Sequence, residues 1–175
     1  MAMLIRREQP TDHAPIRAVL GAAFEDQAAP GGEPVEVGLV DALRASAEWL
    51  PPLALVAESG DGDVLGYVVC TRGWVESRPA LGLGPLAVSP AAQRQGAGSS
   101  LMHAVLGAAD ALEEPLVALL GHTGYYPRFG FRPAVELGID PPVADWAAHF
   151  QVRTLSAYRS DLRGTFTYAQ AFADL

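Results

Sequence analysis

The sequence of 175 residues contains no lysine, so all 12 of its basic residues are arginines, and its formal net charge is −8. An acidic protein repels the phosphate backbone of nucleic acids and favours cationic partners. We therefore expect no nucleic acid among its partners, whereas a positively charged amine would suit it. Hydrophobic residues make up 50% of the chain and charged residues 18%, a balance typical of a globular domain rather than a disordered segment.

Cysteine is scarce and long hydrophobic runs are missing. Cys70 is the single cysteine, which excludes a disulfide within the chain and fits a reducing compartment, and it lies in an apolar strand pattern typical of a buried side chain. No run is long enough to span a bilayer, and the basic pair Arg6 and Arg7 follows too short an apolar segment for a signal peptide. We expect a cytoplasmic protein with no membrane partner, folded as a single domain over residues 1–175.

Patterns for metal binding and for serine nucleophiles are also missing. His13, His103 and His149 show no metal-ligand spacing with one another or with Cys70, so we expect no metal site. No segment resembles the G-x-S-x-G turn that presents a nucleophilic serine. We therefore expect any reaction of this protein to use neither a bound metal ion nor a nucleophilic serine.

A helix that opens with glycines follows a buried strand between Leu83 and Met102. Residues 81–88 form a short apolar run typical of a strand, and from Leu101 onward apolar residues recur at helical spacing. The small residues at 96–98 let a ligand lie against the backbone, and a helix N-terminus presents free amides with a partial positive charge. The expected ligand of this loop is an anionic group.

Two common phosphate-binding motifs do not fit the loop. A P-loop requires a lysine directly after its last glycine, but Gly98 is followed by two serines. A dinucleotide-binding motif requires a third glycine where Leu101 stands, and a loop that opens directly from its strand. The remaining pattern is Gln93-x-x-Gly96-x-Gly98, which lies behind a strand ending in Leu-Ala-Val-Ser-Pro.

This pattern closely resembles motif A of the GNAT N-acetyltransferases, in which the loop holds the pyrophosphate of acetyl-CoA. A second stretch, Gly121-His-Thr-Gly-Tyr-Tyr-Pro-Arg-Phe-Gly-Phe-Arg-Pro133, resembles the family's motif B, where a short helix carries a tyrosine and ends in Gly-Phe. The resemblance is strong over residues 53–133 and weak toward both ends of the chain. It implies an α/β (α+β) GNAT fold, with a central mixed, mostly antiparallel, splayed sheet flanked by helices.

The resemblance also implies where acetyl-CoA would lie. The pantetheine arm would pair as an added strand with the backbone of Leu86, Ala87 and Val88. The pyrophosphate would lie against the following loop, formed by Gln93, Arg94, Gln95, Gly96, Ala97, Gly98 and Ser99.

Candidate catalytic residues come from the second motif. Tyr126 lies four residues before Gly130, where the family commonly carries a tyrosine that donates to the coenzyme sulfur, so we expect it to be the general acid. Tyr125 is the alternative if the short helix is rotated, and packing is the alternative role for the Tyr126 ring. Histidine side chains can take up a proton near neutral pH, so His122 is a candidate base, although it also fits a hydrogen-bonded strand end. Further candidate bases on the acceptor side are Glu25, Glu33, Glu36 and Glu76.

The function implied is transfer of the acetyl group of acetyl-CoA to a primary amine by direct attack in a ternary complex, with a small cationic amine favoured. The alternatives are a non-catalytic acyl-CoA-binding regulatory module and an acetyltransferase for peptide or protein N-termini. An open groove would suit a peptide, and a closed acidic pocket would suit a small cation. Homodimers are frequent in the family, so a homodimer is a further possible assembly.

Periodicity and breaking residues predict the other elements. Pro85 predicts a local loss of pairing in the strand over 81–88, and Gly73 predicts a bulge in the strand before it. The resemblance to the family implies that the terminal segments close the sheet as a hairpin. The predicted helices cover 11–24 and 34–49, and the predicted strands cover 3–7, 53–59, 64–75, 116–120, 135–139, 150–155 and 165–168.

Overall fold

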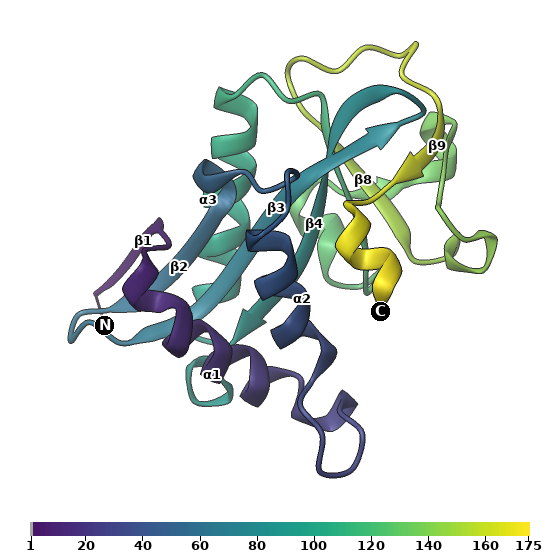
Figure 1. Cartoon of the computed structure of the whole chain (residues 1–175). Helices are drawn as coiled ribbons and strands as arrows, with labels where there is room; N and C mark the ends of the chain where they lie inside the picture. The colour runs from purple at the N-terminus through teal and green to yellow at the C-terminus, as the bar shows by residue number, and fades with distance from the viewer. Residues whose placement is uncertain (1) are drawn as a thin grey trace.

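The computed structural model describes residues 2–175, and one twisted sheet forms its centre (Figure 1). Each neighbouring pair in the main sheet is antiparallel except β4 with β5, which is parallel. This arrangement confirms the predicted mixed, mostly antiparallel sheet. The strand order is β1 (Met3–Arg7), β2 (Ala54–Ser59), β3 (Val64–Val75), β4 (Arg78–Val88), β5 (Leu116–Leu120), β8 (Phe150–Thr154) and β6 (Arg132–Pro133).

Helices cover both faces of the sheet, with α1 (His13–Ala23) and α2 (Val35–Arg44) on one side and α3 (Ala97–Ala111) on the other. Successive strand residues point to opposite faces, so Tyr67 packs with α1 and α2 while Val68 packs with α3. Within residues 2–175 no helix is long and apolar enough to cross a membrane. Short 3-10 turns fill much of the remaining chain: η1 (Pro10–Asp12), η2 (Glu25–Gln27), η3 (Pro51–Leu53), η4 (Pro90–Ala92), η5 (Tyr126–Phe129), η6 (Ala134–Leu137), η7 (Ala144–Trp146) and η8 (Gln170–Asp174).

The predicted irregularity at Pro85 is confirmed. Val68 pairs with Leu86 and Cys70 pairs with Leu83, so two residues of β4, one of them Pro85, face a single residue of β3. Proline has no amide hydrogen to donate to a neighbouring strand, which explains why the extra residue lies here. The predicted bulge at Gly73 is wrong, because this residue stays in register with Ala80.

The C-terminal third differs most from the prediction. Residues 135–139 are mainly the turn η6, and a two-residue strand, β7 (Ile139–Asp140), begins only at their end. The expected terminal hairpin is also wrong, because β9 (Gly164–Thr167) pairs with β3 and β7 while β8 pairs with β5 and β6. Burial explains the pairing of β9. Phe166 is fully buried beside Gly73, where an added Cβ would lie 2.6 Å from its ring.

The helix predicted over 34–49 is shorter, because α2 ends at Arg44. The Ser46 hydroxyl donates to the carbonyl of Leu43 at 2.8 Å, which satisfies an acceptor of the last turn. After this turn Trp49 packs against the cores on the α1 and α2 side of the sheet.

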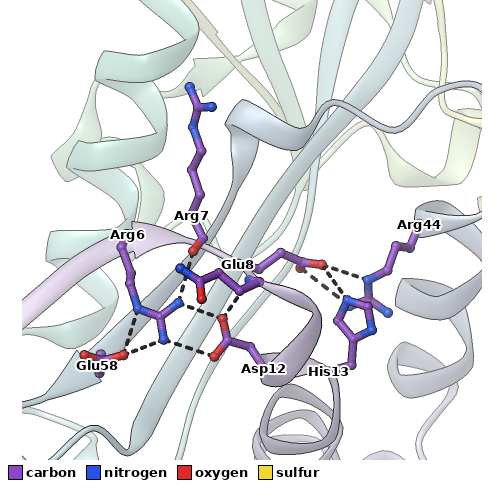
Figure 2. Close-up of polar contacts among 8 residues, drawn as sticks. Arg6, Arg7, Glu8, Asp12, His13, Arg44 and Glu58 are labelled. Atoms are coloured by element: carbon purple, nitrogen blue, oxygen red, sulfur yellow. Dashed lines mark hydrogen bonds and ion pairs between the residues drawn. The ribbon is translucent and has the colours of Figure 1, made fainter.

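A network of ion pairs joins the N-terminal strand to both helices of this side (Figure 2). Arg6 on β1 binds Glu58 on β2 and also Asp12, at 2.7 Å between Nη1 and Oδ2. Glu8 accepts from Nε of Arg44, on α2, at 2.8 Å and lies 3.4 Å from Nε2 of His13, on α1. Because α2 forms one wall of the pocket described below, these contacts hold that wall against the sheet.

Asp12 provides a test of this network. Its side chain is 7% exposed, and the hydrogen bonds from Arg6 lower the pKa of its carboxyl. We expect Asp12→Asn to reduce the free energy of unfolding by about 1–3 kcal/mol at pH 7, because a partly buried arginine loses its charged partner. The folded pKa is below the unfolded one, so this difference is fully present above a pH of about 4 and is lost as the pH falls through the folded pKa.

Urea unfolding of both proteins as the pH is lowered from 7 to 3 measures this difference. Asp61→Asn, in the exposed turn after β2, is the matched control and should change stability little at any pH. An Asp12→Asn loss that stays constant across the pH range would contradict the ion pair as its cause.

Candidate active site

The candidate site lies where β4 and β5 separate. In the described chain two residue pairs join these strands, Leu81 with Val117 and Gly82 with Ala118. Beyond them β4 continues to Val88 and stays paired with β3, whereas β5 ends at Leu120. Residues 83–88 therefore keep a strand edge that β5 does not cover, and their backbone groups on that side can pair with an extended ligand.

A pocket of about 540 Å³ fills the opening between the two strands. Its strand walls are residues 83–86 of β4 and residues 119–122 at the end of β5. Apart from the tyrosines, its ionisable side chains are the carboxylate of Glu36 and the imidazole of His122. No arginine of residues 2–175 lines the pocket. The other lining residues come from five parts of the chain: Phe24, Gln27, Glu36, Leu39, Tyr126, Trp146, Tyr168, Phe172 and Leu175.

The glycine loop predicted to bind pyrophosphate leads from β4 into α3. Gly96 has φ +90° and directly precedes the helix, a left-handed conformation that favours glycine, and Arg94 also has a positive φ of 61°. No side chain caps this helix, and its first helical bond runs from the Ser100 amide to the Gly96 carbonyl at 2.9 Å. The amides of Ala97, Gly98 and Ser99 therefore have no helical partner and carry the positive end of the helix dipole.

Two glutamines assigned to coenzyme binding have structural contacts. Gln93 donates from Nε2 to the carbonyl of Val88 at 3.3 Å, and Gln95 donates to the carbonyl of Ala91 at 3.0 Å. Both side chains thus shape the loop, and Arg94 is exposed on it. Of the strand residues, Ala87 is buried on the α1 and α2 side, so its backbone rather than its side chain can meet a ligand.

The two tyrosines of the second motif face different places. An added Cβ on Gly98 would lie 3.0 Å from the Tyr125 hydroxyl oxygen, so this hydroxyl reaches the N-terminal turn of α3. Tyr126 instead lines the pocket. The rings meet edge to face with centroids 5.0 Å apart. The orientation of η5 determines which tyrosine lines the pocket, and the adjacent pair Tyr125 and Tyr126 in the sequence does not indicate it.

Packing holds the Tyr126 ring in place. Its ring covers Gly121, where any Cβ would overlap it, and it meets Phe131 edge to face at 5.8 Å. Desolvation by burial, with Tyr125 nearby, raises the pKa of Tyr126 to about 12. The phenol therefore keeps its proton at neutral pH and can donate a hydrogen bond into the pocket.

His122 lies at the same end of the pocket as Tyr126. It lies two residues after the end of β5, is exposed, and its carbonyl accepts from the amides of Tyr125 and Tyr126 at 3.1 and 3.4 Å. Its backbone thus starts the turn that carries both tyrosines, while its imidazole lines the pocket.

Of the four acceptor-side carboxylates, the structure places Glu36 in the pocket and the other three elsewhere. Glu33 binds Arg17, and Glu76 accepts from the Thr165 amide at 2.7 Å. Glu25 is exposed on η2. The signal in the sequence was helical spacing, because Glu36 and Leu39 lie on one face of α2 and both line the pocket.

Several aromatic residues of the pocket escaped the sequence reasoning. Trp146, Tyr168 and Phe172 come from the C-terminal third, where no motif marks them. Tyr168 packs on Gly82, where an added Cβ would lie 2.6 Å from its ring, and burial raises the pKa of its hydroxyl. These contacts join residues far apart in the chain, so no local pattern predicts them.

A splayed parallel strand pair, a glycine-opened helix beside it and a tyrosine in the opening are the features that the resemblance to the GNAT acetyltransferases implies. The family model for the acetyltransferase (GNAT) domain matches residues 52–133. The chain is 32% identical over 156 residues to YhbS of Escherichia coli, an uncharacterized N-acetyltransferase, and the match covers 88% of each chain. It is 33% identical over 162 residues to a second uncharacterized N-acetyltransferase of that organism, YjhQ, with 88% of this chain and 85% of the relative covered.

Comparison with solved structures indicates the same family. The crystal structure of YhbS in complex with CoA superposes with a TM-score of 0.86 at 29% identity, covering 98% of this chain and 92% of that one. A GNAT acetyltransferase from Brucella melitensis in complex with acetyl-CoA gives a TM-score of 0.78 at 35% identity, with 98% of both chains covered. This chain therefore belongs to the GNAT family of N-acetyltransferases, which confirms the predicted family, fold and class of acetyl-CoA-dependent enzyme.

The packing of Tyr126 on Gly121 leads to a prediction. We expect Gly121→Ala to displace the tyrosine ring and to lower the turnover number about 10- to 100-fold, because small misplacements of a reacting group are costly. Acetyl-CoA affinity should change little, since Gly121 follows β5 and belongs neither to the glycine loop nor to the open edge of β4. Steady-state thiol release and calorimetry measure the two quantities.

Gly124→Ala is the matched control, because an added Cβ at Gly124 meets nothing within 4 Å. This variant should keep wild-type turnover. Wild-type turnover in Gly121→Ala as well would show that the position of the Tyr126 ring is unimportant.

Proposed function

We propose that this protein transfers the acetyl group of acetyl-CoA to the primary amine of a small cationic molecule by direct attack in a ternary complex. The observation that carries the proposal is the pocket between β4 and β5, which is lined by Tyr126, His122 and Glu36 and lies beside an unpaired strand edge. A non-catalytic coenzyme-binding module would need none of these three side chains in the opening.

The coenzyme would be held by backbone. The pantetheine arm pairs with the open edge of β4 at Leu86, Ala87 and Val88, and the pyrophosphate meets the free amides of residues 97–99, with Arg94 exposed on the same loop. This placement brings the thioester to the point where β5 leaves β4. The two relatives crystallised with CoA and acetyl-CoA support it.

The transfer itself needs a neutral amine and a donor for the departing sulfur. The nitrogen attacks the acetyl carbonyl, a C–N bond forms, and the C–S bond breaks. The Tyr126 hydroxyl donates to the sulfur as that bond breaks, and His122 accepts the proton that the nitrogen releases. After the transfer His122 releases its proton to solvent and the Tyr126 phenolate, whose pKa of about 12 lies above that of a thiol, takes one up, so both side chains end as they began.

The dimensions of the pocket favour a small acceptor. A volume of about 540 Å³ is typical of small-molecule sites. Side chains of the segment after α1, of α2 and of the C-terminal residues line it together with the strands, so the acceptor is enclosed on several sides. A peptide N-terminus would need a groove that leaves room for the following residues.

Binding and turnover test the proposal directly. We expect acetyl-CoA to raise the melting temperature and to bind in calorimetry, and thiol release to be faster with cationic amines than with anionic amines of equal size. Gly98→Trp is the control, because its indole would fill the space beside the free amides. That variant should stay folded by circular dichroism and lose coenzyme binding. Coenzyme binding without thiol release on any amine would argue against a transferase, and no binding would refute the assignment of the glycine loop.

A second test separates the two tyrosines. We expect Tyr126→Phe to lower turnover about 10²- to 10⁴-fold with little effect on acetyl-CoA affinity, because it removes the donor to sulfur. Tyr125→Phe removes a hydroxyl that lies beside Gly98 instead, so it should affect coenzyme affinity more than turnover. Full activity of Tyr126→Phe, or a larger loss of turnover in Tyr125→Phe, would assign the donor differently.

A further inference from the structure

Glu36 has a buried oxygen without a partner. Its Oε2 is inaccessible to solvent and accepts no hydrogen bond from residues 2–175. Burying a carboxylate oxygen without a donor is costly, so the Glu36 carboxylate would be stabilised by a positive charge in the pocket that this residue lines.

The arginines near Glu36 have other partners. Arg17 binds Glu33 and Asp41, and Arg44 binds Glu8 and Asp41. The neighbouring acidic groups are therefore neutralised by protein, whereas Glu36 is left facing the pocket. Residues 2–175 therefore supply no hydrogen-bond donor to the Glu36 Oε2 atom, and a ligand bound in the pocket is the remaining source of a partner.

The other side chains that line the pocket favour a cation as that partner. Phe24, Trp146 and Phe172 line the same pocket, and no arginine of the described chain does. Aromatic faces attract ammonium groups, and the attraction grows when water is excluded. A carboxylate together with several aromatic rings therefore forms a site for a positively charged group.

Glu36 lies on a helix that is fixed in place. Leu39 and Leu43 of α2 pack in one buried cluster with Ala169, next to Phe172. The ion pair of Arg44 with Glu8 joins the other end of the helix to the segment after β1. A carboxylate on such a wall can select a ligand by position.

The group held by Glu36 is not the nitrogen that reacts. A nearby negative charge stabilises an ammonium and raises its pKa, which opposes the loss of the proton that attack requires. Resting on the acetyl transfer proposed above, we propose that Glu36 binds a second, non-reacting cationic group of the acceptor. The protein would thus select diamines, or amines with another fixed positive charge, over monoamines.

The test compares α,ω-diamines with the matching 1-aminoalkanes, in which a methyl group replaces the second ammonium. We expect the wild-type kcat/KM for the best diamine to exceed that of its matched monoamine about 10- to 100-fold, the usual effect of a charged hydrogen bond. Glu36→Gln should reduce this ratio nearly to one and leave acetyl-CoA affinity unchanged. Glu36→Asp keeps the charge and should retain part of the preference.

Glu33→Gln is the matched control, because Glu33 lies three residues earlier and binds Arg17 at 3.0 Å instead of lining the pocket. It should preserve the wild-type ratio. An unchanged ratio in Glu36→Gln, or an equal loss in Glu33→Gln, would overturn the assignment.

Direct binding separates this inference from the transfer reaction. Calorimetry of the CoA-loaded protein with the diamine should show binding that Glu36→Gln loses, whether or not turnover follows. Such binding without thiol release would support the cation site and contradict the acetyl transfer. Thiol release on monoamines with no preference for diamines would support the transfer and overturn the role of Glu36.

Discussion

The separation of β4 from β5 is the constraint on which the rest of the structure depends. Two residue pairs join these strands, and past them β4 follows β3 alone. Pro85 helps to explain the change, because it has no amide hydrogen and lies where two residues of β4 face one of β3. The open edge that results is at once a surface for an extended ligand and one wall of the pocket.

Each face of the sheet contributes a different part of the site. The α3 side supplies free amides at a helix start and the hydroxyl of Tyr125 beside them, which suits an anionic coenzyme. The opposite side supplies Glu36 and aromatic rings, which suit a cation. In the proposed reaction the thioester and the amine would therefore approach the opening from different directions.

Much of the fold could be predicted from local pattern. Alternating apolar residues, helical spacing and the positions of glycine and proline predict several elements correctly. These are the strands Val64–Val75 and Leu116–Leu120, the turn between β2 and β3, and the helix after the glycine loop. Prediction failed where pairing depends on distant partners. The sequence of β9 does not show that Phe166 is buried beside Gly73, so its pairing with β3 was missed.

By itself the sequence determined the glycine loop, the second motif and the family, because these depend on residue types within a few positions of one another. The tertiary structure decided which of two adjacent tyrosines lines the pocket and which of four carboxylates does. Tyr126, Glu36 and Phe172 come from separate segments, and they meet because α2 and the C-terminal residues pack over the opening between β4 and β5. Such contacts form between buried residues that are far apart in the sequence, and no short-range sequence pattern predicts them.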